Sequence, residues 1–330
     1  MNTEVPSIVD VLVVGGSHAG LSTALTLYRA LHTCIIFDSK NPRNKYSTPI
    51  HLTPTWDHKH LDELKEASKK ELRASGIVDF IDVEIVKVEK TNDGLFRATG
   101  SDGQTWIGRK LLLASGSKDK HLNIPGYSEI YAHRIYPCMF QFGYEQKGCP
   151  SAGLLAIEGL GNVPHATMLA DDGNKFASKM TIYTNQNPIL EAEITASLQT
   201  PDIVVDDRKI KRLRTGDGPS DVVIDFDDGT SKVEGFLVHR PETELDRTLV
   251  DQLGLKVSAR GDIEVMPPFC QTSVFGVYAA GDCASPMKII PNAISMGAYA
   301  GCGIARELPN RVTGRIIQPT DQLAEVEPAS

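Results

Sequence analysis

Two glycine-rich segments far apart in the chain carry the residues best suited to bind a dinucleotide. The first, Gly15-Gly16-Ser17-His18-Ala19-Gly20, follows the apolar stretch 11–14. A glycine turn that opens a helix presents backbone N–H groups and the positive helix end to a pyrophosphate. The second, Gly281-Asp282, follows the apolar stretch 277–280, and its carboxylate can accept a hydrogen bond from a polyol hydroxyl. Together the two segments predict one site for FAD.

The residues around the first turn have the spacing of a βαβ unit. The continuous apolar run 9–14 is typical of a buried parallel strand, and residues 21–28 follow with the apolar spacing of a helix. Asp38 ends the next apolar run, 34–37, about 20 residues past the turn, where an acidic residue binds a ribose hydroxyl. His18 has two interpretations: a contact with the flavin, or a solvated or capping residue of the turn.

A loop and then a helix are expected after Gly281-Asp282, through residues 287–293. The N-terminal end of that helix would offer its positive dipole end to the pyrimidine edge of a flavin, where it stabilises negative charge. We therefore include Ile290 and Asn292 in the predicted FAD site.

A second βαβ-like unit lies in the middle of the chain. The apolar run 153–157 leads into Gly159-Leu160-Gly161, and a further strand is expected at 180–183. Pro164 stands where the third glycine would be and has no N–H to offer a pyrophosphate. Residues 184–187 contain neither the acid that NAD favours nor the arginine that NADP favours. NAD(P)H binding is therefore doubtful: the unit is either a divergent working site or a domain kept for its shape and for the substrate pocket.

These elements predict an α/β fold with two Rossmann-like, three-layer nucleotide-binding domains, the second inserted in the first. The FAD-binding domain is expected to be discontinuous, 1–121 plus 238–330, around a degenerate NAD(P)-binding-like domain at 122–237. Within the inserted domain, residues 222–230 predict a hairpin with an Asp-Gly turn.

Composition narrows the class of protein. The 330 residues carry a net charge of -8, which argues against nucleic acid and anionic membranes as partners. No apolar run approaches the roughly 20 residues of a membrane span, and residues 1–10 do not resemble a secretory signal. The cysteines are too scattered for a disulfide framework, so we expect a cytoplasmic protein with reduced thiols: Cys34, Cys138, Cys149, Cys270, Cys283 and Cys302. We predict no metal site.

The chain resembles the low-molecular-weight thioredoxin reductase-like flavoproteins, especially the fungal dithiol oxidases of the gliotoxin type. The resemblance rests on residues 15–27, 37–39, 43–44, 54–60, 114–116, 138–145 and 276–282, and it covers about 1–308. It implies two Rossmann-like domains, a homodimer and non-covalent FAD. It also implies that FAD is lined by Gly15, Ser17, Gly20, Asp38, Arg43, Asn44, Gly281 and Asp282. We extend this predicted site to Gly16, His18, Ala19, Ser39, Val83, Ala114, Gly116, Ile290 and Asn292.

The chain departs from this family at its redox motif. Relatives carry Cys-x-x-Cys where this chain has Cys138-Met139-Phe140-Gln141. The missing second cysteine is the one expected against the flavin, and a single thiol cannot form the disulfide that exchanges electrons with it. Cys149 could replace it only if a loop folded back, and Cys138 is either a pocket-lining residue or a nucleophile.

Three functions follow from these residues. The first is an FAD-dependent oxidase or dehydrogenase that takes a hydride directly from a small molecule and passes electrons to dioxygen, and the family resemblance implies a substrate from fungal specialised metabolism. Its candidate catalytic residues are Gln141, facing the flavin, and Cys138, with His133, Tyr136 or Tyr144 as a base or orienting group. The second is a disulfide reductase or dithiol oxidase with a nonstandard thiol pair. The third is a non-catalytic FAD-binding regulator.

Overall fold

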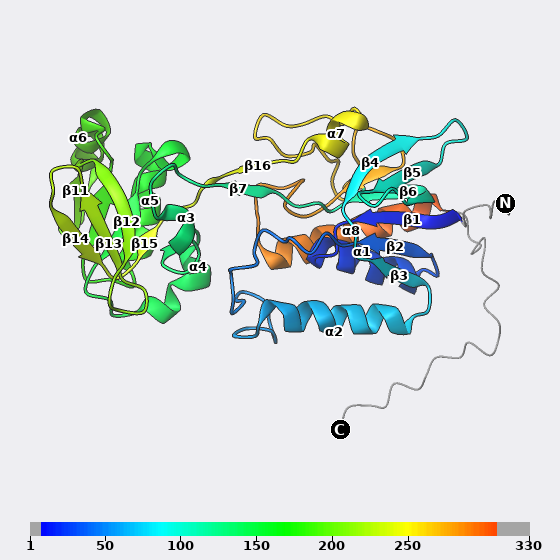
Figure 1. Cartoon of the computed structure of the whole chain (residues 1–330), viewed down its shortest axis with the longest axis horizontal. Helices are drawn as coiled ribbons and strands as arrows, with labels where there is room; N and C mark the ends of the chain where they lie inside the picture. The colour runs from blue at the N-terminus through cyan, green and yellow to red at the C-terminus, as the bar shows by residue number, and fades with distance from the viewer. Residues whose placement is uncertain (1–7, 309–330) are drawn as a thin grey trace, which may run out of the picture. The chain divides into compact units, whose positions relative to one another are not determined.

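A computed structural model describes residues 8–308 and divides the chain into two compact units (Figure 1). The first unit contains 8–45, 59–118 and 244–308 of the described residues, and the second contains Tyr46–His58 and Asp119–Thr243. The predicted FAD-binding domain includes 46–58. The structure groups this segment with the second unit, where the Tyr46 ring meets the edge of the His133 ring at 5.6 Å between centroids. Across residues 8–308, no helix has the length and apolar character needed to cross a membrane.

The first unit is built on a seven-stranded sheet in the order β3-β2-β1-β6-β5-β4, with β17 also pairing with β6. Its strands are β1 (Ile8–Val14), β2 (Cys34–Phe37), β3 (Val78–Ile81), β4 (Ile85–Lys90), β5 (Phe96–Gly100), β6 (Thr105–Leu113) and β17 (Val277–Ala279). The pairs among β3, β2, β1, β6 and β17 are parallel, and β4, β5 and β6 pair antiparallel.

Both faces of this sheet are covered, which explains why its central strands are continuously apolar. The helices of the unit are α1 (His18–Arg29), α2 (Leu61–Ala74), α7 (Thr248–Gln252) and α8 (Ile290–Glu307). Val11 and Val13 face a core shared with α1, α2 and α8, whereas Leu12 and Val14 face a core shared with β4, β5 and α7. Successive side chains of β1 therefore pack alternately into two hydrophobic cores, one on each face of the sheet.

Helices α1 and α8 approach each other closely at a glycine. A Cβ atom on Gly297 would lie 2.2 Å from the carbonyl oxygen of Ala19. The Thr23 hydroxyl donates to the Gly297 carbonyl at 2.8 Å and joins the two backbones. The N-terminal glycine turn is thereby tied to the helix that follows Gly281-Asp282.

The second unit contains a parallel sheet in the order β11-β10-β9-β15-β8 and an antiparallel sheet in the order β12-β13-β14. Its strands are β8 (Ile135–Tyr136), β9 (Ala152–Leu155), β10 (Met180–Tyr183), β11 (Ile203–Asp206), β12 (Ile210–Thr215), β13 (Val222–Phe226), β14 (Ser231–Glu234) and β15 (Leu237–Val238). Its helices are α3 (Tyr127–Ile130), α4 (Met139–Phe142), η1 (Tyr144–Gln146), η2 (Glu158–Leu160), α5 (Val163–Asn174) and α6 (Pro188–Ser197). The segments that connect the units pair as β7 (Lys118–Lys120) and β16 (Glu242–Glu244).

The local patterns predicted in the second unit are confirmed. Strands β9 and β10 pair in parallel on either side of α5 in the sequence, as a βαβ unit requires. The hairpin between β13 and β14 turns at Asp228-Gly229, where Gly229 has φ +86°. This conformation favours glycine because a side chain would be strained there.

Candidate functional site

The carboxyl ends of four parallel strands meet at one edge of the first unit's sheet. Val14 pairs with Phe37 of β2 and with Leu113 of β6, and Leu113 pairs with Ala279 of β17. The residues that follow these ends are therefore neighbours although they are distant in sequence. Ligands of open α/β sheets bind outside this edge, so the structure brings the predicted glycine turn, Asp38, Ala114 and Gly281 to one place.

The glycines of the first turn are required by close backbone approach. Gly15 has φ +120°, and a Cβ on it would lie 2.1 Å from the Ala114 carbonyl oxygen. A Cβ on Gly20 would lie 2.0 Å from the Gly15 carbonyl oxygen, and one on Gly16 would lie 2.6 Å from the Asp38 carboxyl carbon. This compact turn is the cradle that a pyrophosphate needs, and the residues present fit a dinucleotide.

The start of α1 leaves its positive end available. Ser17 occupies the N-cap with an extended backbone, and among the described residues its side chain makes no capping hydrogen bond. The first turn of α1 contains no acidic residue. Its N–H groups can therefore bind an anionic group.

His18 is buried, so its interpretation as a solvated residue is wrong. Burial, assisted by the charge of Lys65, lowers the pKa of His18 to about 4. Within residues 8–308, its Nε2 atom has no hydrogen-bond partner. His18 is thus a neutral imidazole near the start of α1, with an unused polar atom that a cofactor could satisfy.

Asp38 is held by lysines that the sequence analysis did not select. Its carboxylate accepts from the Lys40 N–H at 2.9 Å and from the buried Lys69 ammonium at 3.1 Å. Burial alone would raise the pKa of Asp38, but these donors outweigh it and hold the pKa below its usual range. The only sequence signal for Lys69 is that a lysine stands at a core-facing position of the amphipathic helix α2. The structure gives the reason, because Lys69 is buried there and binds Asp38.

Asp282 and Arg43, both predicted to line FAD, bind each other. Nε and Nη2 of Arg43 donate to the same Asp282 carboxylate oxygen at 3.0 and 2.9 Å. The Lys288 ammonium donates to the Asp282 carbonyl at 2.7 Å and to the Asp262 carboxylate at 3.0 Å. The segment after β17 is therefore fixed by charge-assisted hydrogen bonds within the protein itself.

The other predicted FAD residues differ in their surroundings. Asn292 donates to the Met287 carbonyl at 2.7 Å and to the Ser285 hydroxyl at 3.1 Å, so its amide closes the loop before α8. Val83, Ala114, Ala19 and Gly281 are buried, Asn44, Gly116 and Ile290 are half-buried, and Ser39 is exposed.

In the second unit, Cys138 is the N-cap of the short helix α4, and Gln141 lies half-buried in that helix. All six cysteines of the chain are free thiols. The Cys149 N–H donates to the carbonyls of Gln146 and Phe176, and burial raises the pKa of the Cys149 thiol. Because its backbone is fixed in this way, Cys149 is poorly suited to replace the missing cysteine.

The proposed base or orienting groups occupy two kinds of position, buried and exposed. Tyr136 is buried, its hydroxyl lies 2.9 Å from that of Ser220, and burial raises its pKa. It therefore helps to hold the unit together. His133 is exposed, and the Tyr144 side chain is 74% exposed.

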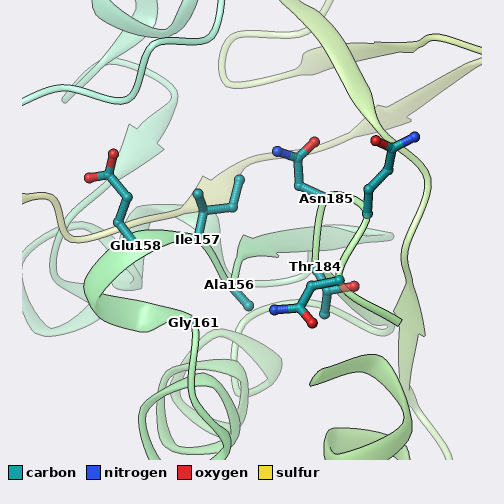
Figure 2. Close-up of a pocket in the computed structure, with 8 residues that line it drawn as sticks. Ala156, Ile157, Glu158, Gly161, Thr184 and Asn185 are labelled. Atoms are coloured by element: carbon teal, nitrogen blue, oxygen red, sulfur yellow. The ribbon is translucent and has the colours of Figure 1, made fainter. Parts of the chain in front are cut away.

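A pocket of about 400 Å³ opens at the carboxyl ends of β9 and β10 (Figure 2). It is lined by Ala156, Ile157, Glu158, Gly161, Thr184, Asn185, Gln186 and Asn187. This is the position of a nucleotide site in such a sheet.

The polar groups of this pocket suit a phosphorylated nicotinamide cofactor poorly. The lining contains the acidic Glu158 and no lysine or arginine. Asn162 caps α5 by accepting the His165 N–H at 3.1 Å, and the Asn185 side chain accepts the Ile210 N–H at 2.8 Å. Pro164 contributes no donor in the first turn of α5. The structure thus adds the negative charge of Glu158 and the engaged His165 N–H donor to the loss of the third glycine.

Known proteins resemble the chain along almost its whole length. Residues 9–297 match the family described as pyridine nucleotide-disulphide oxidoreductase. The chain is 39% identical to thioredoxin reductase aclD of Aspergillus oryzae, over 91% of this chain and 96% of the relative. It is also 39% identical to thioredoxin reductase tcpT of Claviceps purpurea, over 89% of this chain and 92% of the relative. The crystal structure of an oxidoreductase from Agrobacterium tumefaciens superimposes with a TM-score of 0.79 at 25% identity, over 91% of this chain and 98% of that one. The predicted fold class is confirmed.

Proposed function

The chain belongs to the pyridine nucleotide-disulphide oxidoreductase family and is an FAD-dependent oxidoreductase, and we propose that it oxidises a small molecule directly, without a redox disulfide. The observation that carries the proposal is Gln141 in place of the second thiol of the motif. Two further observations support it: all six cysteines are free thiols, and the Cys149 backbone is held by two carbonyls of its own unit.

The first unit would hold FAD through its two glycine segments. The turn 15–20 and the start of α1 would bind the pyrophosphate, with His18 supplying a neutral imidazole. The Asp282 carboxylate, oriented by Arg43, would accept from a hydroxyl of the ribityl chain. The start of α8 would place its positive end toward the flavin, with Ile290 in its first turn.

When bound, FAD would supply the redox chemistry: the substrate would lose a hydride and a proton, and the two electrons would pass to dioxygen with formation of hydrogen peroxide. The protein contributes orientation and electrostatics. Gln141 offers a neutral amide that can donate and accept hydrogen bonds, whereas Cys138 alone has no partner thiol with which to cycle. We propose a small molecule of fungal specialised metabolism as substrate and a homodimer as the working form.

The names of the relatives favour a second candidate, in which thiols take part in turnover. Both relatives are named thioredoxin reductases. Cys138 is the only thiol left in the motif, so this chemistry would need a thiol or disulfide from the substrate.

One experiment separates the two candidates. FAD-loaded protein is mixed with candidate metabolites in air. The hydrogen peroxide released and the free thiols of the protein are then measured in the same sample. Direct oxidation is expected to release peroxide from substrates without thiols, with all six protein thiols unchanged. Peroxide release only with dithiol substrates, or loss of protein thiols during turnover, would contradict it.

NADPH is expected to reduce the bound flavin slowly, at less than about 1 s⁻¹, the lower end of usual turnover numbers. The reasons are the acidic Glu158 in the pocket of the second unit and Pro164 at the start of α5. The measurement is loss of the flavin absorption band after anaerobic mixing with excess NADPH, with dithionite as the control for full reduction. Fast bleaching that saturates with NADPH concentration would overturn the expectation.

Asp282→Ala is expected to weaken FAD binding by roughly 10- to 150-fold, because a hydrogen bond to a charged group contributes about 1.5–3 kcal/mol. Asp251→Ala is the matched control, since this carboxylate of the same unit also pairs with an arginine, Arg247, but lies outside the predicted FAD site. The flavin-to-protein ratio after gel filtration measures the difference. A fully loaded Asp282→Ala protein would count against the assignment.

A further inference from the structure

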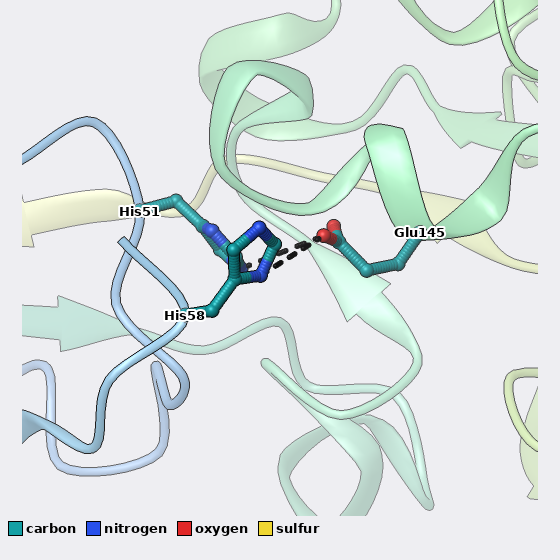
Figure 3. A group of neighbouring side chains, drawn as sticks. All are labelled: His51, His58 and Glu145. Carbon is teal, nitrogen blue, oxygen red and sulfur yellow. Dashed lines mark ion pairs between the residues drawn. The ribbon is translucent and has the colours of Figure 1, made fainter. Parts of the chain in front are cut away.

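Two histidines and a glutamate of the second unit converge outside the predicted nucleotide sites (Figure 3). His51 and His58 lie on the segment Tyr46–His58, and Glu145 lies on η1. One possible ligand atom from each residue lies within 4.8 Å of those of the other two. We propose that these residues form a binding site for a divalent transition metal, with zinc as the ion that their chemistry fits best.

One nitrogen of each imidazole ring lies close to the Glu145 carboxylate. Nε2 of His51 lies 3.7 Å from Oε1 of Glu145, and Nδ1 of His58 lies 4.0 Å from the same oxygen. Ligand atoms about 2.0–2.1 Å from a tetrahedral zinc ion are separated by about 3.3 Å. The two histidine-to-glutamate distances are about 0.4 and 0.7 Å longer than this, and all three ligand atoms lie within 4.8 Å of one another, so side-chain movements of up to about 1.5 Å would bring the three groups onto one ion.

The Asp57 carboxylate lies near the ring nitrogens of both histidines that are not the ones nearest Glu145. Its two carboxylate oxygens lie 3.3 Å from Nδ1 of His51 and 3.1 Å from Nε2 of His58. With a proton on Nδ1, the His51 ring donates to Asp57, and the other nitrogen of each ring lies near Glu145. Such a carboxylate behind a metal-binding histidine fixes its tautomer and its orientation.

The loop that carries the histidines is closed on itself. The His58 N–H donates to the Ile50 carbonyl at 3.0 Å, and the Leu52 N–H donates to the Asp57 carboxylate at 3.1 Å. The two imidazole rings meet nearly at right angles, with centroids 4.8 Å apart. The site is thus held by backbone contacts of its own segment, and only Glu145 comes from elsewhere in the unit.

The ligand set distinguishes among metals. Two imidazoles and a carboxylate suit zinc, whereas calcium and magnesium favour oxygen ligands only. Three protein ligands leave a fourth position for water or an external ligand. The His58 side chain is 63% exposed and that of Glu145 is 39% exposed, so a metal has access from solvent.

The test measures zinc binding by the FAD-loaded full chain, so its result does not depend on the proposed oxidation. Zinc is titrated in competition with a chromogenic chelator, and the bound metal is counted after gel filtration. Wild-type protein is expected to bind one zinc ion per chain, and added zinc is expected to raise its Tm. His58→Asn and Glu145→Gln are expected to weaken binding at least about 100-fold, and Asp57→Asn about 10- to 100-fold.

His165→Asn is the matched control because His165 is also exposed in the second unit but lies outside the cluster. It is expected to bind zinc as wild type does. Circular dichroism checks that each variant is folded, and His58 is exposed enough for its replacement to leave the core unchanged. Wild-type protein without bound zinc, or a His58→Asn variant with wild-type affinity, would overturn the proposal.

Discussion

Gly20→Ala protein is expected to purify with less than about a tenth of the wild-type FAD content. The added Cβ would lie 2.0 Å from the Gly15 carbonyl oxygen and 3.1 Å from the Val13 side chain. Both neighbours are part of the strand and turn that α1 packs against, so the helix must move away from β1. Overpacking of this kind costs about 1–3 kcal/mol, and the movement also displaces the turn proposed to bind the pyrophosphate.

Gly159→Ala is the control for this substitution. Gly159 lies in the corresponding glycine segment of the second unit, where a Cβ would contact only the flexible Glu242 side chain at 3.3 Å. This variant is expected to keep its FAD. The ratio of flavin to protein absorbance after gel filtration compares the two, and circular dichroism shows whether each is folded. Gly20→Ala protein that retains a full complement of FAD would show that the turn does not hold the cofactor.

Gln141→Ala is expected to lower turnover by more than tenfold, whereas Cys138→Ser stays within about tenfold of wild type, or roughly 1.4 kcal/mol of barrier. A single thiol cannot cycle as an intramolecular disulfide, so in the proposed mechanism Cys138 has no redox role. The Gln141 amide is proposed to hydrogen-bond beside the flavin, and truncation removes both its donor and its acceptor.

Phe140→Ala is the matched control, because Phe140 is 70% exposed on the same short helix. It is expected to leave turnover within about twofold of wild type, as surface substitutions usually do. Steady-state rates with one substrate compare the three variants at equal FAD content. If Cys138→Ser abolishes turnover while Gln141→Ala does not, direct oxidation is wrong and a thiol mechanism must replace it.

The sequence was sufficient where the signal is local. The chain runs directly from the apolar strand β1 through the glycine turn into the start of α1. The residue types of this segment follow from the local backbone conformation, so they indicate the structure without tertiary contacts. The strand that ends at Gly281-Asp282 and the Asp-Gly hairpin at 228–229 were predictable for the same reason. The comparisons confirm the fold class, the family and FAD as the cofactor.

Tertiary structure decided the surroundings of the predicted residues. Asp38 was visible in the sequence, but its bond to Lys69 depends on how α2 packs, which no local pattern specifies. The burial of His18 likewise depends on neighbours brought by other elements. Arg43 and Asp282 were both predicted to line FAD, but the sequence did not predict their ion pair. It forms between one residue before and one residue after the inserted unit in the sequence.

The proposed zinc site shows the difference most clearly. Asp57 and His58 belong to the segment 54–60, which resembles the family, whereas His51 lies just before it, and the spacing of these residues matches no metal motif. Glu145 lies far along the chain, after the first unit's strand β6 and the connection to the second unit. The sequence by itself determined the strands, the turns and the nucleotide-binding architecture, because hydrophobic periodicity and backbone conformation are local properties. Only the tertiary structure placed the imidazoles, the carboxylates and the lysine partners together, because such contacts depend on long-range packing.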